Sequence, residues 1–216
     1  MINFSSWLTF LIISLSAAFS PGPAVLLVMN TAGRLSVYDA VFSSFGNAFG
    51  LIILSIVVMS GLTYLMQESA WGFLLVKICG AAYLISIGVK QIYRSFKPDI
   101  DALKTKSGML TSDGRFGLFR QGVLIALSNP KAILFLSAVF PQFLTIGNVQ
   151  LSQFLILLMT FIFCSLLSHT FYVWLTLNLG KRLQGQVWAN RAKRLLGFLF
   201  IVIGMSLLGV NASMTT

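Results

Sequence analysis

The chain has 216 residues, of which 57% are hydrophobic and only 9% are charged. A soluble domain carries about 25% charged residues, so this composition excludes an ordinary soluble fold and indicates a protein whose solvent is lipid. The net charge of +10 would suit a nucleic-acid-binding protein, but the basic residues fall in alternate loops between apolar segments. We therefore expect no nucleic-acid partner and a lipid bilayer instead.

Six apolar runs approach the roughly 20 residues that a helix needs to cross a bilayer. In chain order they cover residues 7–29, 40–65, 71–93, 117–140, 154–179 and 195–210, and only the sixth is short. The sequence therefore predicts an all-α integral membrane protein, with six transmembrane helices in a single domain over residues 1–216.

Basic residues mark every second connection between these runs. Arg34 follows the first run, a basic loop at 96–116 follows the third, and five Lys and Arg without any acid follow the fifth. Cytoplasmic loops of membrane proteins carry an excess of Lys and Arg. We therefore expect these three connections in the cytoplasm and both termini on the outer side.

An internal repeat relates the two halves of the chain. Residues 20–27 read SPGPAVLL and residues 128–135 read SNPKAILF, and each stretch lies in the first run of a three-run half. Three crossings is an odd number, so the second copy must enter the membrane from the opposite face. The sequence predicts an inverted 3+3 repeat, with repeats at 1–95 and 117–216 and a broken first helix in each.

The two proline-containing stretches are the candidate binding site. They contribute Pro21, Gly22, Pro23, Asn129 and Pro130. Proline removes a backbone donor, and the freed carbonyls are costly unless the break faces protein or a watery cavity. Two matched breaks favour a shared polar cavity near the midplane that suits a zwitterion. The alternative is that the prolines only kink two helices for packing.

Lys131 lies about 12 residues into the fourth run, roughly 18 Å along a helix. A lysine at that depth costs about 2.5–3.5 kcal/mol on insertion scales, so something must compensate its charge. It either binds a substrate carboxylate or bridges to the carbonyls freed by the first break.

Asn47 is a further candidate for the site. It lies between Gly46 and Gly50, which form a GxxxG pair that allows close helix approach. Asn47 either lines the cavity or bonds a neighbouring helix.

Five stretches together carry a family resemblance. They are SPGPAVLLVMNTAGR, GNAFG, KICGAAYLISIGVK, FRQGVLIALSNPKAILFLSAVFPQF and NRAKRLLGFLFIVIG. In this order and spacing, the chain resembles the LysE/RhtB family of amino-acid exporters, also called LysE-type translocators, over nearly its whole length. The resemblance implies a six-helix secondary transporter in the bacterial inner membrane, for which the outer side assigned to both termini by the loop charges is the periplasm. It also implies export of amino acids, such as homoserine, threonine or related derivatives, driven by the proton motive force.

The predicted spans hold few groups that could carry the coupled proton. Asp39 lies at the cytoplasmic start of the second run, and His169 is the only histidine, with an ordinary pKa near neutrality. These two are the candidates for proton coupling, although a lone histidine is also typical of a hydrogen-bonded packing residue. Because no carboxylate is embedded in a span, neutral amino acids are the favoured substrates.

An enzymatic function is not expected. The sequence has no Cys and His spacing for a metal, no phosphate-binding loop and no paired carboxylates. We expect no cofactor and no metal site. The expected partners are an amino-acid substrate, lipid and protons, with a second copy of the chain as a candidate for a homodimer. The alternative function is a membrane channel or a regulatory or scaffold subunit without active transport.

Overall fold

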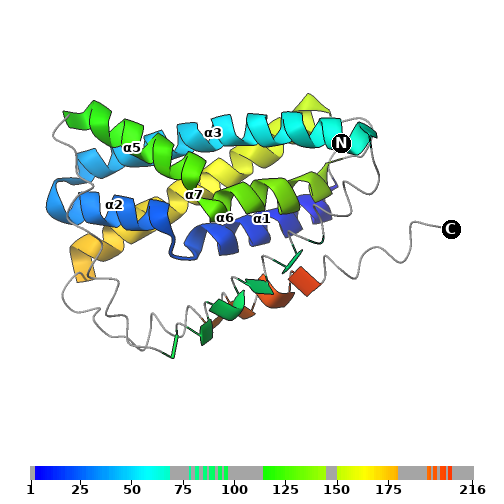
Figure 1. The fold of residues 1–216 in the computed structure, drawn as a ribbon. Coiled ribbons are helices and arrows are strands. Elements are labelled where there is room, and N and C mark those ends of the chain that lie inside the picture. The colour runs from blue at the N-terminus through cyan, green and yellow to red at the C-terminus, as the bar shows by residue number, and fades with distance from the viewer. Residues whose placement is uncertain are drawn as a thin grey trace.

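A computed structural model describes residues 3–68, 114–144 and 150–179, together with short stretches within 78–96 and 194–205. All regular structure in these ranges is helical (Figure 1). The elements are α1 (Phe4–Phe19), α2 (Pro23–Arg34), α3 (Val37–Glu68), α5 (Gly114–Ser128), α6 (Pro130–Leu134), the π-helical turn η1 (Phe135–Val139), the 3₁₀ turn η2 (Phe140–Phe143) and α7 (Leu151–Leu179). The predicted loop 96–116 lies almost entirely outside the described residues, and the third and sixth runs are described only in short helical pieces.

Among the described residues, α3 and α7 are each long and apolar enough to cross a membrane. Two further spans arise if each bent pair counts as one: α1 with α2, bent by 54°, and α5 with the segment from Pro130 to Phe143, bent by 51°. The all-α class is therefore confirmed, and the runs at 7–29, 40–65, 117–140 and 154–179 are helical.

The two bends occur where the chain places a proline after a residue that cannot remain helical. A residue that precedes proline is driven out of the α region by the proline ring. Ser20 and Asn129 both have extended backbone, with ψ of 120° and 106°, and both immediately precede a proline. Pro23 and Pro130 then occupy the start of the next helix, where a missing N–H costs no hydrogen bond. The prolines thus end one helix and start another.

The two broken helices run in opposite directions. In Figure 1, α1 and α2 follow one another toward the left of the view, whereas α5 and α6 follow one another toward the right. Helix α3 packs against α5, and α7 packs against α1 and α2. Each broken pair therefore packs against one of the two unbroken helices.

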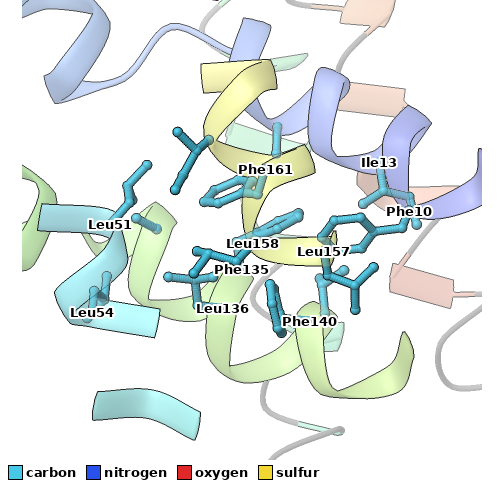
Figure 2. Packing of buried hydrophobic residues seen from close by; sticks show 14 of the residues in the cluster. Phe10, Ile13, Leu51, Leu54, Phe135, Leu136, Phe140, Leu157, Leu158 and Phe161 are labelled. Atoms are coloured by element: carbon cyan, nitrogen blue, oxygen red, sulfur yellow. The ribbon is translucent and has the colours of Figure 1, made fainter. Parts of the chain in front are cut away.

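Aromatic side chains form the centre of the core (Figure 2). The rings of Phe135 and Phe161 stack with centroids 4.5 Å apart and an angle of 10° between their planes. Phe10 of α1 meets Phe140 edge to face, with centroids 5.7 Å apart. This cluster joins α1 to α7 and to the segment that follows the second break.

Glycines allow α3 and α5 to cross with their backbones in contact. A Cβ atom on Gly46 would collide with the carbonyl oxygen of Phe119, and one on Gly122 would collide with that of Ser43. This confirms the close helix approach predicted from the GxxxG pair. In the short pieces from the third and sixth runs, a Cβ on Gly88 would likewise lie 2.5 Å from the carbonyl oxygen of Gly197.

We predict that Gly46→Ala destabilises the protein although alanine favours helices, because the added methyl group must push α3 and α5 apart. Overpacking of this kind costs about 1–3 kcal/mol. The measurement is thermal unfolding of the purified protein in detergent. Gly61→Ala is the matched control in α3, since nothing lies within 4 Å of a Cβ added there. Equal midpoints for the two variants would contradict the prediction.

Candidate functional site

The two helix breaks touch one another. The Lys131 ammonium, at the start of α6, donates a hydrogen bond of 2.6 Å to the carbonyl oxygen of Ser20, at the end of α1. Gly22 lies beside the same lysine, because a Cβ atom added to it would be 3.7 Å from the Lys131 Cδ atom. The bridge from Lys131 to a carbonyl freed at the first break, one of the two predicted alternatives, is thus present.

The end of α1 is held by side chains from the second half of the chain. Three consecutive carbonyls each accept one hydrogen bond: Ala18 from Ser168 Oγ at 2.8 Å, Phe19 from Tyr172 Oη at 2.6 Å and Ser20 from Lys131 Nζ at 2.6 Å. The last four carbonyls of any helix lack a partner within the helix, and in hydrocarbon each unpaired group costs several kcal/mol. Donors from α6 and α7 therefore make this break tolerable.

The two helices that follow the breaks, α2 and α6, differ in how their N-terminal ends are capped. At α6, the side chain of Asn129 caps the helix by accepting from the Lys131 amide at 3.1 Å. At α2, Gly22 offers no side-chain cap, and the first helical bond runs from the amide of Leu26 to the carbonyl of Gly22. The amides of Ala24 and Val25 precede that bond, so the start of α2 keeps open donors and a partial positive charge.

A cavity of about 50 Å³, enough for a few water molecules, lies between the two breaks. Its lining comes from α1, α2, α3, α6, η1, α7 and the two breaks: Ala17, Ala18, Gly22, Ala24, Val25, Asn47, Leu51, Asn129, Lys131, Ala132, Phe135, Phe161, Ser165 and His169. The cavity thus lies between the two proline-containing breaks, where the sequence predicts one.

The structure brings together five of the residues predicted for the site. Gly22, Asn47, Asn129, Lys131 and His169 all line the cavity. The three prolines, Pro21, Pro23 and Pro130, are exposed and are not among the lining residues. They shape the backbone at the breaks, while their neighbours present the polar groups.

One face of α7 lines this cavity, and its side chains change from apolar to polar along the helix. Phe161, Ser165 and His169 are four residues apart and all line it. Ser165 accepts a hydrogen bond of 3.3 Å from the side-chain amide of Asn47. His169 is only 2% exposed, and its Nδ1 atom has no hydrogen-bond partner among the described residues. The wall therefore changes from apolar at Phe161 to polar at His169.

Asp39 does not join this site. It lies in the first turn of α3, where its carboxylate pairs with Arg115 at 3.5 Å and accepts from Ser36 Oγ at 2.7 Å. It is not among the residues that line the cavity. Helix α2 ends and α5 begins at the same end of the bundle, so Arg34 and Arg115 gather there with Asp39 (Figure 1).

Sequence reasoning missed the polar stripe on α7. Ser165, Ser168, His169 and Tyr172 follow the spacing i, i+3, i+4 and i+7, which places them on one face of a helix that is otherwise strongly apolar. Only His169 was singled out from this set. The periodicity of the polar residues within an apolar run was the available signal.

We predict that Tyr172→Phe lowers stability by about 1–3 kcal/mol, because it leaves the Phe19 carbonyl unpaired while keeping the ring. The measurement is thermal unfolding of purified protein in detergent. Thr170→Val is the matched control on α7, since the Thr170 hydroxyl is exposed and bonds only to a carbonyl of its own helix. A Tyr172→Phe protein as stable as the control would show that this bond does not hold the break.

Comparison with known proteins identifies the family. The model of the family described as LysE type translocator matches residues 15–210. The homoserine/homoserine lactone efflux protein of Salmonella typhimurium is 32% identical over 203 residues, which cover 94% of this chain and 96% of that protein. An uncharacterized membrane protein of Vibrio cholerae is 29% identical over 206 residues, or 95% and 98% of the two chains. The threonine efflux protein of Escherichia coli K12 is 28% identical over 137 residues, which cover 63% of this chain and 66% of that protein.

No solved structure matches the chain significantly. The chain belongs to the LysE type translocator family, whose members are transporters and not enzymes.

Proposed function

We propose that this protein exports small neutral amino acids, such as homoserine, threonine or close derivatives, across the bacterial inner membrane. The names of its relatives, which include homoserine and threonine efflux proteins, support the substrate class. The observation that carries the proposal is the polar cavity at which two broken helices meet around one lysine. The six-helix, two-repeat architecture is part of the proposal.

Lys131 binds the substrate carboxylate in this mechanism. An ammonium group has three hydrogens, so Lys131 can keep its bond to the Ser20 carbonyl and still donate to a carboxylate. Ala24 and Val25 line the same cavity, at the positive end of α2. Both roles considered for Lys131, the structural bridge and the substrate ligand, are thus compatible.

The charges around the cavity favour a neutral side chain. None of the side chains that line it in the described part of the chain is acidic, and Lys131 adds a positive charge. A substrate with a second cationic group would meet that charge without a carboxylate to neutralise it. Lysine and arginine are therefore poor substrates in this proposal.

The proposed architecture is an inverted repeat with halves at 1–95 and 117–216, joined by a cytoplasmic basic loop at 96–116. The opposite directions of the two broken helices support it (Figure 1), as does the position of Arg34 and Arg115 at one end of the bundle, which the positive-inside rule assigns to the cytoplasm. Both termini are then periplasmic. Rocking of one repeat against the other would expose the central site to each side in turn.

Protons are the proposed coupling ion. Of the two predicted carriers, His169 lines the cavity, whereas Asp39 is paired with Arg115 at the start of α3. His169 is therefore the side chain through which a proton could affect substrate binding directly.

We predict that Lys131→Met raises the apparent KM for a transported amino acid about ten- to hundredfold, the effect of losing a hydrogen bond to a charged group. The measurement is counterflow in proteoliposomes with neutral, cationic and acidic amino acids. Lys90→Met is the control, since Lys90 is exposed. Size-exclusion profiles establish that both variants are folded. Wild-type transport by a folded Lys131→Met protein would refute the assigned role.

We predict that an inward proton gradient accelerates amino-acid efflux several-fold from proteoliposomes loaded with substrate, and that a protonophore removes the acceleration. Efflux that saturates with substrate but ignores the gradient would refute proton coupling. Efflux that neither saturates nor responds would favour the channel alternative, and no efflux of any amino acid would favour a scaffold.

A further inference from the structure

His169 has a ring nitrogen that the protein leaves unused. The side chain is 2% exposed, it lines the cavity, and its Nδ1 atom has no partner among the described residues. Buried polar atoms are nearly always hydrogen-bonded, so an atom without a partner among the described residues indicates a site for a water molecule or a ligand. Within the same residues, the buried hydroxyls of Ser14 and Ser43 also lack partners, but neither lines the cavity. His169 combines both properties.

The position of His169 is set by its neighbours on α7. Ser168 and Tyr172 bond to the carbonyls of Ala18 and Phe19 at the end of α1. His169 lies between them in sequence and therefore at the level of the first break. Lys131 reaches the same break from α6, through its bond to Ser20. The histidine and the lysine thus border one small cavity from two different helices.

An amino acid that binds here needs an acceptor for its ammonium group as well as a donor for its carboxylate. Two other acceptors at the cavity already carry one hydrogen bond each: Ser165 Oγ accepts from Asn47, and Asn129 Oδ1 accepts from the Lys131 amide. A neutral imidazole with its hydrogen on Nε2 presents a lone pair at Nδ1. It can accept from an ammonium group without adding the positive charge that Lys131 would oppose.

We propose that His169 Nδ1 accepts a hydrogen bond from the ammonium group of the bound amino acid, while Lys131 binds its carboxylate. This assignment rests on the proposed export function and makes His169 a substrate-binding residue. The side chain of the substrate then points along α7 toward Phe161, which is two turns before His169 and stacks on Phe135. In this proposal a short apolar substrate side chain contacts Phe161 at this end of the cavity.

The test compares two variants and two ligands in counterflow with the purified full chain in proteoliposomes. The variants are His169→Leu, which removes the acceptor, and His169→Asn, whose amide oxygen takes the approximate place of Nδ1. The ligands are L-threonine and its deamino analogue, in which hydrogen replaces the ammonium group. Ser14→Ala is the control, because Ser14 is also buried and unpaired but does not line the cavity.

We expect His169→Leu to raise the apparent KM for threonine about tenfold, with little change in the maximal exchange rate, and His169→Asn to restore most of the affinity. The inhibition constant of the deamino analogue should change less than about twofold in both variants, since it has no ammonium group to lose. Wild-type protein should itself prefer threonine to the analogue by about tenfold or more, a measurement that does not depend on any variant folding.

Three results would overturn the assignment. The first is a wild-type KM in folded His169→Leu protein. The second is an equal loss of affinity for threonine and for the analogue, which would indicate a structural role. The third is equal affinity of the wild-type protein for the two ligands. Wild-type protein that exchanges no amino acid at all would overturn the proposed function, and this assignment with it.

Discussion

The carbonyl groups at the end of α1 impose the constraint on which the site depends. Inside a bilayer such groups can be paired only by other protein groups or by water in a cavity, so a helix that stops there needs donors from its surroundings. Ser168 and Tyr172 of α7 provide two of these donors, and Lys131 of α6 provides the third. These bonds hold the end of α1 against the second half of the chain. The cavity is the space that remains where the two interrupted helices cannot pack fully.

The two breaks are similar in angle but differ in what they offer. The first is three residues long and leaves both the end of α1 and the start of α2 without a side-chain cap of their own. The second is one residue long and is capped by Asn129. The first break therefore supplies backbone groups, and the second supplies the ammonium group of Lys131. Both kinds of group lie together at the interface of the two breaks, where the proposed zwitterionic substrate would meet them.

Much of this arrangement could be predicted from the sequence, because it follows from local rules. The residue before a proline is driven out of the helical conformation, so the breaks at Ser20 and Asn129 were predicted from PGP and NPK. The depth of Lys131 predicted a compensating partner, and the carbonyl bridge was one of the two alternatives considered. The donors on α7 were not predicted, because a serine hydroxyl can also bond within its own helix and only packing decides its partner. The π-helical turn at Phe135–Val139 was likewise not predicted; there the ring of Phe135 contacts Phe10 of α1 and stacks on Phe161 of α7.

The bond between Lys131 and Ser20 joins residues that are 111 positions apart, and this separation has a consequence for biogenesis. A nascent segment that carries a lysine near its middle partitions poorly from the translocon into lipid. Ser20 has already been synthesised and inserted by the time the ribosome reaches the second half. The second half expressed alone would lack the Ser20 carbonyl, and the Lys131 ammonium would have to find another partner.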